Sequence, residues 1–140
     1  DDDMVTALTY AAKRGVDTVI VMPHIPDKKY AFMLAHSYYP ELMEAGVKIY
    51  EYLPGFIHSK TFVSDDEKAV VGSINMDFRS QYLNFECAVY IYKNPVIGDI
   101  RADFDETLKK CVRMSMESYE SLPLMHRFWG RTLRLIAQLM

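Results

Sequence analysis

Five side chains in a short central segment have types that suit phosphate chemistry: His58, Lys60, Asp65, Ser73 and Asn75. A neutral imidazole such as that of His58 can act as a nucleophile or proton shuttle near neutral pH. The Lys60 ammonium can neutralise phosphate oxygens. The Ser73 hydroxyl and the Asn75 amide can donate hydrogen bonds to the same oxygens. Together these residue types predict a site that attacks and holds a phosphate group.

Local structure is expected to bring these side chains together. Residues 58–64 include a β-favouring run and predict a strand, in which His58 and Lys60 share one face because side chains two apart point the same way. Residues 65–68 form a polar turn, and residues 69–73 predict a returning strand. The resulting hairpin would carry the serine and the asparagine back towards the histidine and the lysine.

The spacing H-x-K-x4-D-x6-G-S-x-N resembles the signature of the phospholipase D superfamily at every signature position. The surrounding residues look like the second half of a bacterial cardiolipin synthase. The segments that carry this likeness are residues 37–39, 41–42, 44–52, 54–56, 75–80 and 84–86. The resemblance covers nearly the whole chain, and its loosest part is the last helix.

The resemblance implies a phosphohistidine mechanism that needs two such motifs. In that family one motif histidine attacks phosphorus, and the other protonates the leaving alkoxide. By analogy with two-motif enzymes, His58 would be the general acid and then the base that activates the acceptor alcohol, although the sequence leaves this assignment open. Lys60, Ser73 and Asn75 would bind the phosphate, and Asp65 would support the architecture and electrostatics of the site.

Glu86 is the strongest candidate outside the signature. A catalytic imidazole needs a partner on its second nitrogen to fix its tautomer and orientation. Residues 83–92 alternate as a strand would, with Glu86 on the face opposite the apolar residues. The resemblance implies a hydrogen bond from Glu86 to the motif histidine, whereas the simpler interpretation is a solvated face. Asn84 and Asp27 are further candidate substrate contacts, with strand capping and turn formation as alternatives.

The remaining histidines carry weaker signals. His24 lies in a loop after a buried strand, a common place for ligand contacts. His36 and His126 are expected to be surface histidines. The sequence contains no His/Cys/Asp cluster with the spacing of metal ligands, and the resemblance implies neither a metal nor a cofactor, because lysine and histidine replace the cation.

Composition limits the classes of function. A net charge of −3 is unlike that of a generally basic nucleic-acid binder, so nucleic acid is not expected as a partner. Half of the 140 residues are hydrophobic, enough for one domain core, but no uncharged apolar run approaches the roughly 20 residues that a membrane span needs. The first methionine is Met4, so we expect a fragment of a longer polypeptide, without the other catalytic half.

The order of elements predicts an α/β fold with a mixed β-sheet flanked by helices on both faces. We expect one phospholipase D-like half-domain over residues 1–122 and a C-terminal amphipathic helix over residues 123–140. The expected helices cover residues 3–14, 28–45, 96–118 and the segment after 123; the expected strands cover residues 16–22, 47–52, 58–64, 69–73 and 83–92.

The last helix has a pattern of its own. Arg127, Arg131 and Arg134 form one stripe, and no acidic residue follows Leu124. The apolar residues on the opposite side are Met125, Phe128, Trp129, Leu135, Ile136 and Leu139. This pattern is typical of a helix lying on anionic lipid. The alternatives are a helix packed on the core and a dimer contact.

The favoured hypothesis is a phosphatidyl transfer that joins two phosphatidylglycerols into cardiolipin and glycerol. The chain would supply one of two half-sites, at a bacterial cell membrane with the catalytic domain on the cytoplasmic side. Its partners would be phosphatidylglycerol, the missing N-terminal half and the membrane surface, with a homodimer as another way to unite two motifs. The alternatives are a phospholipase D or phosphodiesterase that uses water, and a non-catalytic membrane-docking or dimerisation module.

Overall fold

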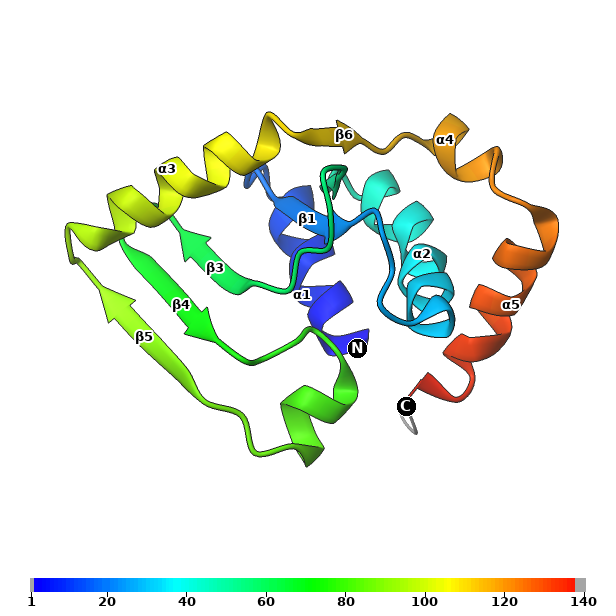
Figure 1. Ribbon diagram of the computed structural model, residues 1–140, viewed down its shortest axis with the longest axis horizontal. Helices are drawn as coiled ribbons and strands as arrows, with labels where there is room; N and C mark the ends of the chain where they lie inside the picture. Colours follow the sequence, from blue (N-terminus) through cyan, green and yellow to red (C-terminus); the bar gives the residue numbers. More distant parts are fainter. Residues whose placement is uncertain (1, 138–140) are drawn as a thin grey trace.

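The computed structural model describes residues 2–137 and contains two three-stranded sheets with helices around them (Figure 1). The first sheet has the order β1-β2-β6, formed by Val19–Pro23, Lys48–Tyr52 and Cys111–Arg113. The second has the order β3-β4-β5, formed by Lys60–Ser64, Lys68–Gly72 and Ala88–Tyr92. The α-helices are α1 (Asp2–Lys13), α2 (Lys29–Glu44), α3 (Val96–Leu108), α4 (Met116–Glu120) and α5 (Leu124–Arg134).

The predicted α/β fold with helices flanking the strands is confirmed, and its strands are divided between two sheets. Strand β2 pairs in parallel with β1 and antiparallel with β6, so the first sheet is mixed. The second sheet is entirely antiparallel.

The strand expected from residue 58 begins only at Lys60, so His58 lies just outside it. Two further predicted elements are wrong in extent by more residues. The helix expected to reach residue 118 ends at Leu108, because residues 111–113 leave the helix and pair with β2. The strand expected from residue 83 begins only at Ala88, and a single π-helical turn, η1 (Arg79–Leu83), precedes it. In the shortened helix, pairing with distant residues outweighs the local pattern.

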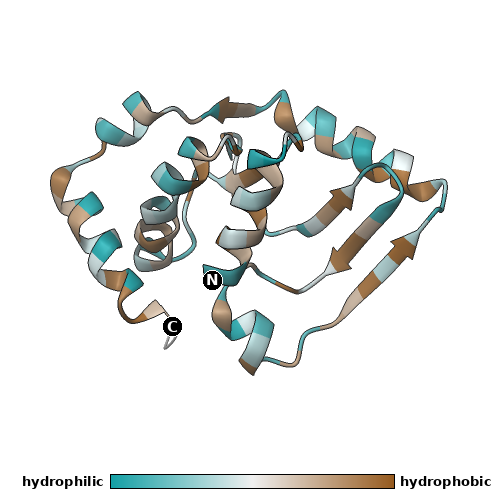
Figure 2. Ribbon diagram, turned by 180° about the vertical axis from the view of Figure 1, so that it is seen from behind, coloured by the Kyte–Doolittle hydropathy of each residue, from teal (hydrophilic) through white to brown (hydrophobic). Residues whose placement is uncertain are grey.

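The main core forms where α1, α2 and α4 cover the first sheet. Figure 2 shows hydrophobic residues recurring along the strands of both sheets. The buried residues of this core are Val5, Ile20, Tyr39, Leu42, Val47, Ile49 and Tyr119. Gly46, with a φ of 99°, follows α2 and turns the chain into β2, a conformation that glycine adopts without steric cost.

Helix α5 packs along α2. Gly130 is buried in this contact, and a Cβ there would lie 2.3 Å from the Met33 carbonyl oxygen. At the C-terminal end of α5, the Arg134 guanidinium donates to the Glu41 carboxylate at 2.9 Å. No helix of residues 2–137 is long and apolar enough to cross a membrane. The proposed boundary between residues 122 and 123 stays a prediction, and Leu139 lies outside the described residues.

Candidate active site

His58 and Lys60 lie where the chain enters the second sheet. Residues 53–59 connect β2 to β3, and Lys60 is the first residue of β3. The Lys60 ammonium donates to the His58 carbonyl oxygen at 2.9 Å, and the Phe56 ring stacks on the exposed His58 imidazole with centroids 5.5 Å apart. The imidazole is therefore accessible to a ligand and is supported on one side by an aromatic ring.

The predicted hairpin is confirmed, and its register brings the second part of the signature to the first. Lys60 pairs with Gly72, so Ser73 follows directly beside the lysine. A Cβ at Gly72 would lie 2.3 Å from the Cys87 carbonyl oxygen, so only glycine fits between β4 and the start of β5. The Ser73 amide donates to that same carbonyl oxygen at 3.0 Å, which fixes the serine at this position.

Glu86 joins this group from the segment before β5. Its carboxylate accepts hydrogen bonds from the Ser73 hydroxyl and, at 3.3 Å, from the Asn84 amide. The hydrogen bond from Ser73, together with a further one from Ser80, lowers the pKa of Glu86, and the charge of Lys60 acts in the same direction. The site thus contains a carboxylate that stays ionised. The expected hydrogen bond to His58 is not among those of the described residues, and this role stays a prediction.

Two opposing effects act on the pKa of the Lys60 ammonium. Partial burial lowers its pKa, and the negative charges of Glu86 and Asp77 raise it only in part, so the net shift is downward. Lys60 and Glu86 thus influence each other as opposite charges without a direct ion pair among the described contacts, and an incoming phosphate would add a second negative charge near the lysine.

A polar loop between β4 and η1 positions Asn75. The Asn75 amide donates to the Ser80 hydroxyl at 3.2 Å, and the Ser80 backbone amide donates to the Asp77 carboxylate at 2.7 Å. Ser80 is buried and contacts both Asn75 and Glu86, so it connects two candidate residues. Sequence reasoning gave Ser80 no role, although it lies inside the segment that resembles the family.

Two expected site residues lie elsewhere. Asp65 occupies the turn beyond the far end of β3, and the strand itself spans about 13 Å from Lys60 to Ser64 at roughly 3.3 Å per residue. Asp65 and Asp66 both have a φ of 54°, and the Asp65 carboxylate accepts a hydrogen bond from the Ser64 hydroxyl at 3.1 Å. Asp27 lies in an exposed loop after β1. The geometry thus gives Asp65 a role in the turn. Its predicted support of the site and the predicted substrate contact of Asp27 stay predictions.

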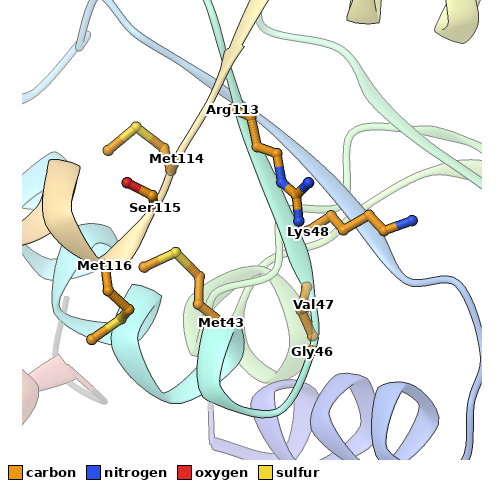
Figure 3. A pocket seen from close by; sticks show the side chains of 8 residues that line it. All are labelled: Met43, Gly46, Val47, Lys48, Arg113, Met114, Ser115 and Met116. Carbon is orange, nitrogen blue, oxygen red and sulfur yellow. The ribbon is translucent and has the colours of Figure 1, made fainter.

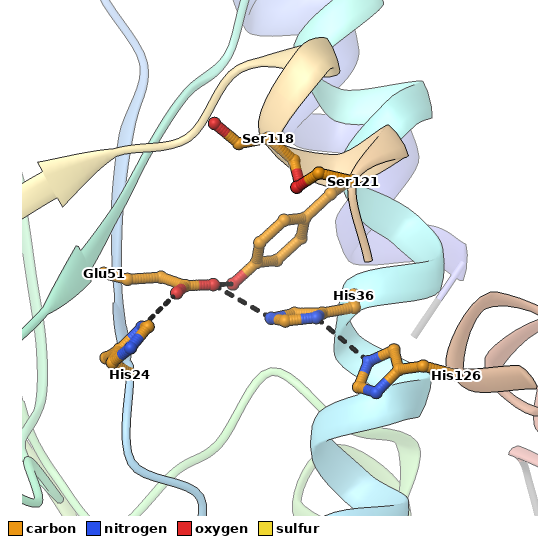
Figure 4. Close-up of polar contacts among 7 residues, drawn as sticks. His24, His36, Glu51, Ser118, Ser121 and His126 are labelled. Carbon is orange, nitrogen blue, oxygen red and sulfur yellow. Dashed lines mark hydrogen bonds and ion pairs between the residues drawn. The ribbon is translucent and has the colours of Figure 1, made fainter. Parts of the chain in front are cut away.

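The prediction of surface histidines is wrong for His36, which is buried, whereas His126 is only partly buried. Both belong to a hydrogen-bonded network around Glu51 (Figure 4). The buried Glu51 carboxylate contacts His24 Nδ1 at 2.7 Å, His36 Nε2 at 2.9 Å and the Tyr39 hydroxyl at 3.1 Å. His36 Nδ1 in turn lies 3.1 Å from His126 Nε2. This network links α2, α5, β2 and the loop after β1.

The network keeps Glu51 ionised. Burial raises the pKa of this carboxyl, but hydrogen bonds from His36 and His24, the charge of His36 and the Tyr39 hydroxyl together lower it below its ordinary value. Burial and the neighbouring His36 also lower the pKa of His126. The fold therefore favours an anionic Glu51 and a neutral His126.

Two hollows on the described surface lie away from the signature. One of about 380 Å³ lies beside the start of β2 and the end of β6 (Figure 3). Its lining includes Lys48, Arg113 and Ser115 but no histidine, cysteine or carboxylate to act with them, so we assign it no chemistry. A second, mostly apolar hollow of about 320 Å³ lies between Pro26, Lys29 and His126. Residues 2–137 contain no cluster of His, Cys, Asp or Glu that could hold a metal ion.

Two solved structures are similar in fold. The phospholipase D family member Nuc from Salmonella typhimurium matches 80% of this chain and 73% of its own, with a TM-score of 0.69 and 24% identity. NucT from Helicobacter pylori matches 81% of this chain and 75% of its own, with a TM-score of 0.58 and 16% identity.

Sequence comparison finds relatives along the whole chain. An uncharacterized protein of Streptococcus mutans is 50% identical over 140 residues, and the cardiolipin synthases of Geobacillus sp. (strain WCH70) and Alkalihalophilus pseudofirmus are 44% and 41% identical. The chain spans only 28–30% of the length of these three relatives. The family described as "Cardiolipin synthase, PLD-like domain" matches residues 1–108. The chain therefore belongs to this phospholipase D-like family.

Proposed function

We propose that this chain supplies one half-site of a phosphatidyltransferase that converts two phosphatidylglycerols into cardiolipin and glycerol. The observation that carries the proposal is the hairpin register, which sets Lys60 opposite Gly72 and beside Ser73, with the accessible His58 imidazole next to them. In a family of cardiolipin synthase domains, this cluster offers one acid–base group and several donors to a single phosphate.

Each residue has a defined part in the proposed reaction. A motif histidine attacks phosphorus, the bond from phosphorus to the glycerol oxygen breaks, and a second histidine protonates the departing oxygen. The hydroxyl of another phosphatidylglycerol then attacks the phosphohistidine and returns its proton to that second histidine. His58 takes the second role, while Lys60, Ser73 and Asn75 stabilise the negative phosphate oxygens. Glu86 keeps Ser73 and Lys60 in place between turnovers.

A complete site of this kind needs a second motif. The cardiolipin synthases that resemble this chain are more than three times its length, so a longer polypeptide can supply one. Two copies related by a two-fold axis would be another arrangement. We expect negligible cardiolipin synthesis from the 140-residue chain alone.

Product analysis tests the proposed function. The protein, expressed with all of its natural flanking sequence, would be incubated with phosphatidylglycerol vesicles, and the lipids would be identified by mass spectrometry. We expect cardiolipin and glycerol in equal amounts, because each transfer releases one glycerol. Phosphatidate without cardiolipin would mean that water is the acceptor, and the hydrolase alternative would then replace this proposal.

Helix α5 is the proposed contact with the membrane surface. Two of its arginines make contacts within the protein: Arg134 bonds to Glu41 and lies over the Tyr38 ring, and Arg127 donates to the Glu120 carbonyl oxygen. The exposed apolar residues of α5 and of the turn that follows it are Leu124, Met125, Phe128, Trp129, Leu135 and Ile136. This composition suits insertion of apolar and aromatic side chains between lipid headgroups. Of the three arginines in the stripe expected from the sequence, the exposed Arg131 is therefore the main candidate for contact with anionic lipid headgroups.

Substitution of the apolar residues should separate lipid contact from packing. Changing Phe128 and Trp129 together to serine is expected to weaken binding of the chain to anionic vesicles by at least about tenfold, since each side chain buries apolar surface. Vesicle co-sedimentation measures this change. The matched control is Tyr90→Ser, which removes an equally exposed aromatic side chain from the second sheet. Unchanged binding of the double variant would exclude α5 as the lipid contact.

A further inference from the structure

The Glu51 network leaves one imidazole free to bind a ligand. Glu51 has a side chain only 2% exposed, and as a carboxylate it can only accept hydrogen bonds. His24 and His36 must therefore each present an N–H to it, from Nδ1 and Nε2 respectively. The second nitrogen of His36 is already occupied by His126 at 3.1 Å.

His24 differs from His36 in its exposure. Its side chain is 52% exposed, whereas that of His36 is 3% exposed. Because Nδ1 of His24 donates to Glu51, the neutral ring carries its lone pair on Nε2. Figure 4 shows His24 and His36 approaching Glu51 from different sides. A buried carboxylate thus fixes both the orientation and the tautomer of an accessible imidazole, as it does for catalytic histidines.

The position of His24 relates it to the candidate active site. The backbone amide of His24 donates to the Tyr52 carbonyl oxygen at 3.1 Å, so the residue lies at the carboxyl ends of the parallel strands β1 and β2. Ligands of α/β sheets bind at this edge. The segment that leads to His58 starts from the same edge, directly after Tyr52. The reaction proposed above gives no role to His24.

We propose that His24 binds a hydroxyl of the polyol headgroup that enters or leaves the active site. A hydroxyl of a glycerol-type alcohol donates to Nε2, while a neighbouring hydroxyl of the same molecule attacks phosphorus. His24 is then a specificity-determining residue that favours a polyol over water, and Glu51 is a positioning residue that acts through it. This inference rests on the proposed phosphatidyl transfer.

Alcohol exchange can test this role without cardiolipin synthesis. The protein with its natural flanking sequence would transfer the phosphatidyl group from phosphatidylglycerol to labelled glycerol or to 1-propanol, which has no second hydroxyl. We expect His24→Ala to raise the KM for glycerol about tenfold, the effect of one lost hydrogen bond, and to leave the KM for 1-propanol within about twofold. Glu51→Gln should also raise the KM for glycerol, because the His24 ring loses the carboxylate that fixes its orientation.

Two further variants complete the design. His126→Gln alters the far end of the network without touching His24, and we expect it to leave the glycerol KM unchanged. His24→Gln retains a hydrogen-bonding amide and serves as the test variant if the alanine variant loses its cooperative thermal unfolding; it is expected to lose part of the preference for glycerol.

The outcomes distinguish this inference from the proposed function. Equal losses with both alcohols, or no change with either, would overturn the role of His24 while transfer by the wild type stands. Phosphatidate as the sole product of the wild-type protein would overturn the proposed transfer itself, and the alcohol contact with it.

Discussion

Replacing His58 with alanine is expected to lower the rate of phosphatidyl transfer by about 10³-fold or more, because general acid–base catalysis and nucleophilic catalysis both depend on a positioned imidazole. Release of glycerol from phosphatidylglycerol vesicles, by the protein with its natural flanking sequence, measures this loss. His58 is exposed, so the variant should unfold at nearly the same temperature as the wild type.

A neighbouring residue provides the control. Ser59 follows His58 directly, and its hydroxyl bonds at 2.8 Å to that of Thr61, which lies on the opposite face of β3 from Lys60. Ser59→Ala should keep activity within about twofold of the wild type, as expected for an exposed position outside the site. Activity of His58→Ala above a few per cent of that of the Ser59 variant would rule out an essential His58.

The choice of leaving group separates the two roles open to His58. A nitrophenolate needs no proton to depart, so a general acid is dispensable with a p-nitrophenyl phosphodiester. If His58 is the general acid, the alanine variant should still release one equivalent of nitrophenol per site and then stop as a phosphohistidine on the other motif. No burst would mean that His58 is the nucleophile.

The hairpin could be predicted because its signals are local. Residue types at fixed offsets define β3, the turn and β4, and the observed pairing of Lys60 with Gly72 follows from them. Glu86 was also predicted as a site residue, from a strand expected over residues 83–92. That strand begins only at Ala88, so Glu86 lies before it. Its approach to Ser73 depends on the π-helical turn before it, which is closed by a hydrogen bond from the Asn84 backbone N–H to the Arg79 carbonyl oxygen at 2.8 Å. No short-range pattern indicates such a turn.

The Glu51 network was missed because its members lie far apart in sequence, yet one local signal was available. In β2 the side chains of Ile49 and Glu51 share the buried face, since residues two apart point the same way. A glutamate at an apolar position of a strand must find donors, because buried charges are stable only when paired. The sequence could therefore have predicted partners for Glu51, although not that they would be His24, His36 and Tyr39.

Replacing Glu51 with glutamine is expected to reduce the free energy of unfolding by about 3 kcal/mol, as for other buried charged networks that lose one partner. The carboxylate accepts from both imidazoles and from the Tyr39 hydroxyl. An amide has one accepting oxygen and one donating nitrogen, so a histidine N–H would face another N–H in a buried place. Urea denaturation of the 140-residue chain at pH 7 measures this loss.

Glu41→Gln is the matched control, because Glu41 also pairs with a basic side chain but is 52% exposed. An exposed ion pair contributes less than about 1 kcal/mol, so this variant should stay close to the wild type. A Glu51→Gln variant as stable as Glu41→Gln would contradict a structural role for the network.

The pH dependence tells whether charge is the cause of this loss. The folded-state pKa of Glu51 lies below its ordinary value of 4.5, so its stabilisation is complete above that pH and is lost as the pH falls through the folded pKa. His126 also has a lowered pKa, and protonation of the unfolded chain should already reduce stability as the pH falls below about 6.5.

Both effects weaken the wild type in acid, but only the effect of His126 remains in Glu51→Gln. The difference in unfolding free energy between the two proteins should therefore be greatest near pH 7 and shrink below pH 4.5. A difference that stays constant down to pH 3 would instead assign the loss to packing and hydrogen-bond geometry.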